Sequence, residues 1–144
     1  MQPLLSISEG MTDSDRIAPD ADAIEEIVER TITSLPEAFR GAAKKIVVRI
    51  EDFPSEAMLS DADLDDPFAL TGLYEGIPVT EKSVMDQPHG PDVIWLFRRA
   101  ILDEWVDRGN VTLSQLVAHV YIHELAHHFG WSDNDIAAID EWWT

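Results

Sequence analysis

The sequence has 144 residues, 45% of them hydrophobic, which suits one folded domain with its own core. It contains no cysteine, which excludes disulfide bonds and any thiolate nucleophile or metal ligand. The formal net charge of -18 would repel phosphate backbones and anionic lipid, so we expect neither a nucleic-acid nor a membrane partner. We interpret this charge as a solvated acidic surface, with a preference for basic peptides as the alternative.

The beginning of the chain has no pattern typical of a targeting or membrane-spanning segment. Residues 1–18 are polar with few aromatic side chains, and we expect a flexible N-terminal arm there. No segment approaches the roughly 20 apolar residues that a transmembrane helix needs. We therefore expect a soluble, cytoplasmic protein with one domain over residues 19–144.

The middle of the chain alternates helical and strand patterns. Acidic residues and helical apolar spacing predict a helix over residues 20–32, and the β-branched run at 46–50 predicts the first strand. The segment 67–76 indicates a short helix that ends at a glycine. Residues 77–80 and 92–98 predict two further strands, separated by a loop rich in proline and glycine.

The next helix carries the chemistry. Thr112 and Gln115 form the pattern of a capping box at its start, and Gly130 is placed to end it. Apolar residues occur on nearly every face between them, which is typical of a buried helix. Histidines and a glutamate on such a helix are costly unless each has a partner, and a metal ion is a common one. A short final helix is expected to run to Trp142.

Residues 123–133 read HELAHHFGWSD and match the pattern HExxHxxGxxD. Residues four apart lie on one helix face, so His123 and His127 can offer imidazole nitrogens to a single ion, with Glu124 beside it. The HExxH string is associated with zinc metalloproteases. With this composition the full pattern arises by chance roughly once in ten thousand such chains, so the long form is specific.

The candidate ligands and base each have a structural alternative. Gly130 can turn the chain back after the helix, which makes Asp133 the candidate third ligand. Alternatively, Ser132 caps the final helix and Asp133 is only a first-turn carboxylate, in which case Asp135 is the fallback ligand. His123 and His127 could be hydrogen-bonded core histidines. Glu124 could be a satisfied core carboxylate instead of a general base.

The remaining histidines carry less information. His119 lies one turn before His123, about 6 Å along the helix axis, so we expect it to support a ligand or to pack instead of binding the ion. His128 points about 100° away from His127, and we expect a polar contact there. His89, in the loop, is uninformative.

At this point the chain resembles the short bacterial single-domain zincin-like metallopeptidases. The resemblance rests on three stretches, 70–83 (LTGLYEGIPVTEKS), 94–99 (IWLFRR) and 123–133. It implies an α+β, minimal zincin-like fold in which a small mixed sheet packs against a buried active-site helix with flanking helices. It also implies metal ligands at His123, His127 and Asp133, with Glu124 as the base. It implies no particular substrate.

We therefore expect a zinc-dependent peptidase that hydrolyses peptide bonds through a metal-activated water, with Zn²⁺ as cofactor and a peptide or protein as substrate. By analogy with the family, the peptide would pair with an edge strand near Val93–Phe97. The alternative is a non-catalytic zinc-binding or protein-interaction domain that keeps the fold. The larger metzincins have a histidine where Asp133 stands and a methionine turn further on. All four methionines here precede the motif, so we expect no methionine turn. No tyrosine follows the motif either, and Tyr74 is therefore the tyrosine that we consider as a proton donor.

Overall fold

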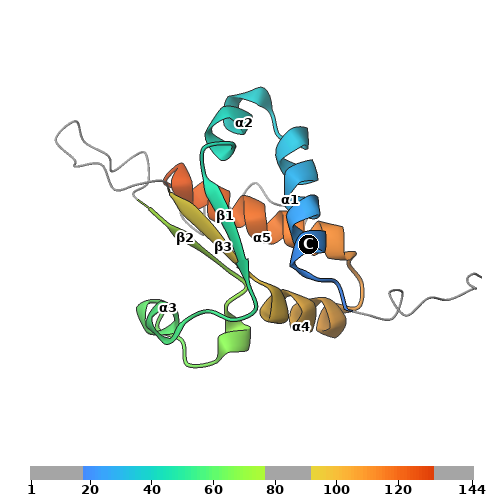
Figure 1. Ribbon diagram of the computed structural model, residues 1–144, viewed down its shortest axis with the longest axis vertical. Helices are drawn as coiled ribbons and strands as arrows, with labels where there is room; N and C mark the ends of the chain where they lie inside the picture. The colour runs from blue at the N-terminus through green and yellow to red at the C-terminus, as the bar shows by residue number, and fades with distance from the viewer. Residues whose placement is uncertain (1–17, 77–91, 132–144) are drawn as a thin grey trace, which may run out of the picture.

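The computed structural model describes residues 18–76 and 92–131, and the structural statements below concern these residues. In them a three-stranded sheet packs against long helices, with shorter helices around its ends (Figure 1). The elements in chain order are α1 (Ala21–Ser34), α2 (Glu37–Ala43), β1 (Val47–Glu51), α3 (Glu56–Asp61), the 3-10 turn η2 (Pro67–Ala69), β2 (Gly72–Glu75), β3 (Val93–Phe97), α4 (Arg98–Arg108) and α5 (Leu113–His128).

The sheet is mixed, with the strand order β1-β3-β2. The central strand β3 runs parallel to β1, with Ile94 opposite Val48, and antiparallel to β2, with Ile94 opposite Tyr74. The prediction that Val93–Phe97 is an edge strand open to a peptide is therefore wrong, because β3 has a partner on each side. The edge strand next to α5 is β2.

The core lies between one face of the sheet and the helices α1 and α5. Successive side chains of a strand point to opposite faces, and in β3 the two that face the core, Ile94 and Leu96, are fully buried. They pack in one apolar cluster with Ile24 of α1 and with Leu116 and Tyr121 of α5. The cluster holds α5 against the sheet. Figure 1 shows α5 beside the strands.

Several predicted elements are confirmed, and the sheet and helices together confirm the α+β class with a minimal zincin-like fold. Helix α1 begins after Asp20, whose side chain accepts a hydrogen bond of 2.9 Å from the Ala23 amide. Strands β1 and β3 occupy the predicted segments within one residue at each end. Helix α5 starts at the predicted capping box.

The prediction of a helix over residues 67–76 is wrong beyond its first turn. Only Pro67–Ala69 is helical, as a 3-10 turn, and Gly72–Glu75 is strand β2. The reason is tertiary, because β2 completes its hydrogen bonds against β3, a partner that local spacing does not reveal. Helices α2, α3 and α4 were not predicted, and α4 begins at Arg98, which we had placed in the strand.

Other expectations fall outside the described residues. These are all but the last residue of the arm predicted over residues 1–18, the strand at 77–80, the loop containing His89 and the final helix to Trp142. Among the helices that the structure describes, none is long and apolar enough to cross a bilayer.

Candidate active site

Helix α5 presents the candidate ligands from a firmly capped start. The Thr112 hydroxyl accepts from the Gln115 amide at 3.0 Å, and the Gln115 side chain accepts from the Thr112 amide at 2.9 Å. This reciprocal pair satisfies two amides that the first turn of a helix leaves without partners. Sixteen helical residues follow, and the HExxH part of the motif, residues 123–127, lies in the last two turns.

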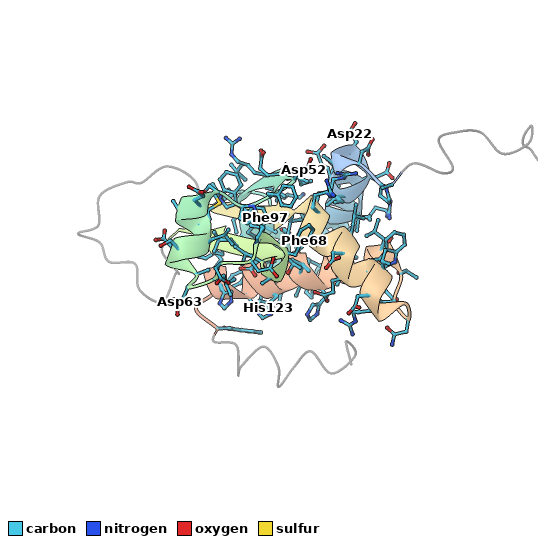
Figure 2. All side chains as sticks on the ribbon, turned by 90° about the horizontal axis from the view of Figure 1, so that it is seen from below. Asp22, Asp52, Asp63, Phe68, Phe97 and His123 are labelled. Carbon is cyan, nitrogen blue, oxygen red and sulfur yellow. The ribbon has the colours of Figure 1, made fainter. Side chains whose placement is uncertain are left out.

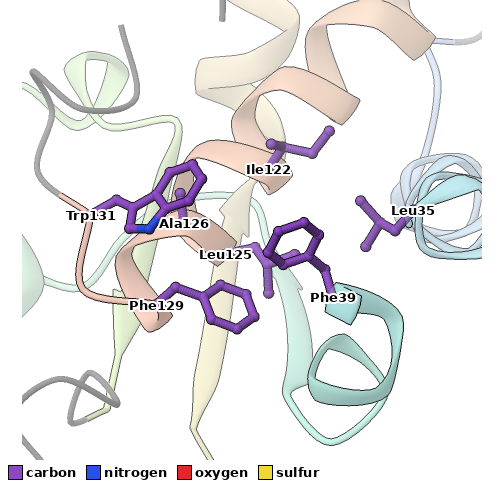
Figure 3. Close-up of a pocket in the computed structure, with 7 residues that line it drawn as sticks. All are labelled: Leu35, Phe39, Ile122, Leu125, Ala126, Phe129 and Trp131. Carbon is purple, nitrogen blue, oxygen red and sulfur yellow. The ribbon is translucent and has the colours of Figure 1, made fainter. Parts of the chain in front are cut away.

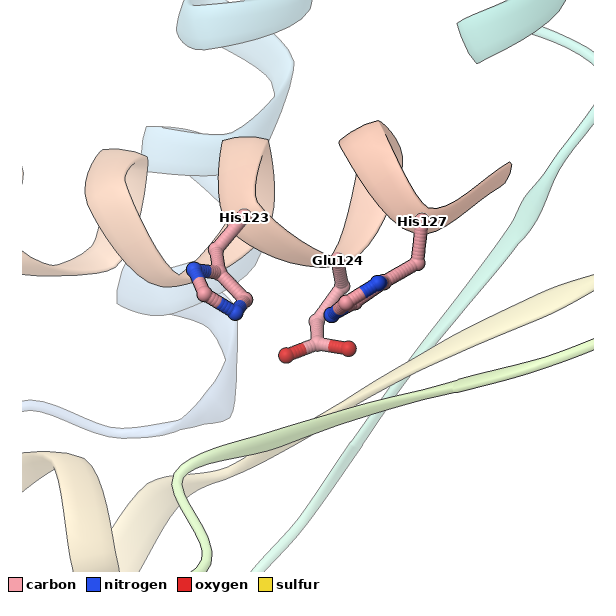
Figure 4. Close-up of side chains that lie close together, drawn as sticks. All are labelled: His123, Glu124 and His127. Atoms are coloured by element: carbon pink, nitrogen blue, oxygen red, sulfur yellow. The ribbon is translucent and has the colours of Figure 1, made fainter. Parts of the chain in front are cut away.

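Three side chains of the motif converge beside α5. The potential ligand atoms of His123, Glu124 and His127 all lie within 4.8 Å of one another, and each residue is half-buried. The two imidazole centroids are 5.0 Å apart. Figure 4 shows the three side chains pointing into one space on the side of α5 where the strands run, and Figure 2 shows His123 at the margin of the molecule.

The helix ends in a Schellman turn. The Gly130 amide donates to the His127 carbonyl at 2.9 Å, and the Trp131 amide donates to the Ala126 carbonyl at 3.1 Å. Gly130 has φ +81°, which L side chains rarely adopt, so a glycine is required at this point. The predicted glycine stop is confirmed.

This turn also fixes the imidazole of His127. Its Nδ1 lies 3.1 Å from the backbone carbonyl oxygen of Trp131. A carbonyl can only accept, so Nδ1 carries the proton and Nε2 keeps its lone pair for a metal ion. Metal-binding histidines usually donate their other N–H to a carboxylate or carbonyl, which holds the ring and raises its basicity.

Strand β2 lies directly beside the proposed base. A Cβ added at Gly72 would lie 2.7 Å from Val120 Cγ1 and 3.2 Å from Glu124 Cγ. The absence of a side chain at Gly72 therefore lets the strand backbone approach α5 at this point. Sequence reasoning missed this contact, because the glycine was assigned to a helix.

The side chains present suit a divalent metal such as zinc. Neutral imidazole nitrogens and carboxylate oxygens are common zinc ligands, at about 2.0–2.2 Å from the ion. Two ligand atoms on one ion are then at most about 4.4 Å apart, so small side-chain rotations bring His123 and His127 onto one centre, with Glu124 beside it. Asp133 and the fallback Asp135 lie outside the described residues, so the third-ligand assignment stays a prediction.

The neighbouring histidines take separate roles. The pKa of His119 is lowered to about 4, first by burial and then by His123 and Arg108, so its ring is neutral at physiological pH. His128 is buried, and its Nδ1 lies 2.8 Å from Asp92 Oδ2 and 3.2 Å from the Tyr74 hydroxyl. The expected polar contact of His128 is confirmed. Its partner Asp92, the residue before β3, was not singled out from the sequence.

An apolar pocket lies on a different side of α5 (Figure 3). Its wall includes Leu35 at the end of α1 and Phe39 of α2, and the remaining lining residues are Ile122, Leu125, Ala126, Phe129 and Trp131. None of the three converging side chains lines it. The pocket belongs to the packing between helices and is separate from the candidate site.

Comparison with known families agrees with this geometry. The sequence model of the family described as zincin-like metallopeptidase matches residues 43–143, which is 101 of the 144 residues. No curated protein showed significant similarity to the chain. The matched range contains all three strands and the whole of α5, and the family implies zinc for the cluster of His123, Glu124 and His127. The chain therefore belongs to the zincin-like metallopeptidase family.

Proposed function

We propose that the protein is a zinc-dependent peptidase that hydrolyses peptide bonds, with Glu124 as the general base. The observation that carries this proposal is the convergence of His123, Glu124 and His127 beside an edge strand. Membership in the zincin-like metallopeptidase family supports it. A purely structural metal site needs ligands but no base, and the intact Glu124 favours chemistry.

In this mechanism His123, His127 and Asp133 would hold the zinc ion. When bound, zinc polarises the scissile carbonyl and lowers the pKa of a coordinated water towards 7. Glu124 accepts the proton of the attacking water and transfers it to the leaving amine. The Trp131 carbonyl keeps the His127 ring in the tautomer that binds metal.

The substrate would be an extended peptide or protein segment that pairs with the outer edge of β2. Within the described residues, β2 has a strand partner on one side only, so its other edge can form backbone hydrogen bonds. Gly72 places that strand next to Glu124, and a peptide bond aligned there would lie near the base. We expect no nucleic-acid or membrane partner, because the net charge of -18 would repel phosphate groups and anionic lipid.

Metal analysis tests the ligands. Purified wild type should retain about one zinc per chain, and His127→Ala should lose it. Comparing Asp133→Asn with Asp135→Asn separates the proposed third ligand from its fallback, because zinc binding should weaken only when the true ligand is replaced. Full zinc content in His127→Ala would refute the ligand assignment.

Digestion of a peptide library tests the chemistry. We expect Glu124→Gln to keep its zinc and to lose activity by about 10²–10⁴-fold, the usual size of a general base effect. Glu75→Gln is the matched control, since it removes a carboxylate from β2 that accepts from Trp95 Nε1 at 2.8 Å and lies outside the cluster. Zinc retention without cleavage of any peptide by wild type would favour the non-catalytic zinc-binding or protein-interaction domain.

A further inference from the structure

Three polar side chains from distant parts of the chain meet at the C-terminal end of α5. Tyr74 comes from β2, Asp92 precedes β3, and His128 is the last residue of α5. The Tyr74 hydroxyl donates to Asp92 Oδ2 at 2.8 Å, and His128 Nδ1 lies 2.8 Å from the same oxygen. We call these three residues the anchor cluster.

The hydrogen bonds of the anchor cluster define its protons. One carboxylate oxygen faces both partners and can only accept, so the Tyr74 hydroxyl and His128 Nδ1 each carry a hydrogen directed at Asp92. Burial, together with the hydrogen bond and charge of Asp92, raises the pKa of Tyr74, which keeps the hydroxyl protonated at neutral pH. Hydrogen bonds to an ionised carboxylate are stronger than hydrogen bonds between neutral groups. Asp92 can therefore hold β2 and the end of α5 together through Tyr74 and His128.

The backbone at Gly76 encloses the anchor cluster. A Cβ at Gly76 would lie 2.5 Å from Asp92 Cγ and 2.7 Å from the Tyr74 hydroxyl. The Tyr74 and His128 rings also meet edge to face, with centroids 5.8 Å apart. Backbone and rings together leave little room for the three groups to separate.

We propose that Tyr74, Asp92 and His128 are positioning residues for the metal site. These residues fix the last turn of α5 against β2. Their role at a metal site rests on the proposed function. His128 follows His127 in that turn, and the same turn continues into the Trp131 carbonyl that orients the His127 ring. Tyr74 lies two residues after Gly72, where an added Cβ would lie 3.2 Å from Glu124 Cγ. The cluster therefore sets the spacing between ligand, base and edge strand.

Tyr74→Phe tests the inference, because it removes the hydroxyl and keeps the ring packed on His128. The matched control is again Glu75→Gln, in the neighbouring residue of the same strand. It removes the charge of a side chain that accepts a 2.8 Å hydrogen bond from Trp95 Nε1 on the opposite face of the sheet. Asp92→Asn provides a second variant if Tyr74→Phe folds poorly by circular dichroism. All measurements use the full chain.

Hydrogen exchange and imidazole ¹⁵N spectra of the metal-free protein give the first readout. We expect the Gly130 and Trp131 amides to exchange roughly tenfold faster in Tyr74→Phe than in wild type, and His127 to lose its single Nδ1–H tautomer. The control should match wild type. Unchanged exchange and an unchanged tautomer in both cluster variants would overturn the inference, whatever the protein does with metal.

Zinc affinity, measured by competition with a chelator, gives the second readout. We expect Tyr74→Phe to bind zinc about tenfold more weakly, as is common when a group that orients a ligand is removed. Faster exchange with unchanged zinc affinity would show a purely structural contact and would overturn the positioning role. If wild type itself binds no zinc, the proposed function fails, and the exchange and tautomer data still decide whether the cluster fixes the turn.

Discussion

Gly72→Ala should destabilise the protein through a single added methyl group. The new Cβ would lie 2.7 Å from Val120 Cγ1, 3.2 Å from Glu124 Cγ and 3.3 Å from the Trp95 carbonyl oxygen. Real Cβ contacts essentially never fall below 3.0 Å, so Val120 or the strand must move. Val120 is only 5% exposed and has a β-branched side chain with restricted rotamers, so it cannot swing away freely.

The expected cost follows from overpacking. Extra carbon atoms forced into a packed interior typically cost about 1–3 kcal/mol, partly offset here by the lower chain entropy of alanine in the unfolded state. Gly41→Ala in α2 is the matched control, because a Cβ there meets nothing within 4 Å. It should stabilise the protein by about 0.5–1 kcal/mol. The same chemical change thus has opposite signs at the two positions.

Urea unfolding of the metal-free protein, followed by circular dichroism, measures both free energies. If β2 is displaced from α5, Gly72→Ala should also bind zinc more weakly, while Gly41→Ala should not. A Gly72→Ala variant as stable as Gly41→Ala would refute the close approach of β2 to the active-site helix.

Two further predictions concern groups buried on α5. The Tyr121 hydroxyl has no hydrogen-bond partner among the described residues, so Tyr121→Phe should raise the free energy of unfolding by about 1–2 kcal/mol, measured by urea unfolding; a loss of stability would indicate an unseen partner. The pKa of His119 is lowered from 6.5 to about 4 in the folded protein, so between these pH values the residue takes up a proton on unfolding. The free energy of unfolding should therefore decrease by at most about 3 kcal/mol as the pH falls from 6.5 to 4. His119→Gln should remove this part of the acid dependence in metal-free protein, and an unchanged pH profile would contradict the assignment.

Local sequence signals predicted α5 and its ends well. The capping box at Thr112 and the positive φ of Gly130 are properties of a few neighbouring residues, so the sequence contains what is needed to predict them. The same holds for the convergence of His123 and His127, which follows from helical spacing. These features needed no knowledge of the tertiary fold.

The strand beside the site could not be predicted in the same way. Gly72–Glu75 is short, begins with a glycine and is stabilised by pairing with β3, which lies about 20 residues away in the sequence. Its single glycine and its apolar residues fit a helix end as well as a strand. The contact of Gly72 with Glu124 and that of Tyr74 with Asp92 both depend on this pairing, so both escaped the sequence analysis.

The position of the motif on α5 has an electrostatic consequence for the bound ion. The carbonyl end of a helix carries roughly half a negative charge, which stabilises nearby cations within about one turn. His127 lies in the last turn of α5, and the Trp131 carbonyl that follows the turn accepts its Nδ1 proton. A cation held by His127 would therefore lie close to the negative end of α5, and the same residues near the start of the helix would lose this stabilisation. With His127 as a ligand, the Schellman turn would support metal binding by placing the Trp131 carbonyl that orients the His127 ring.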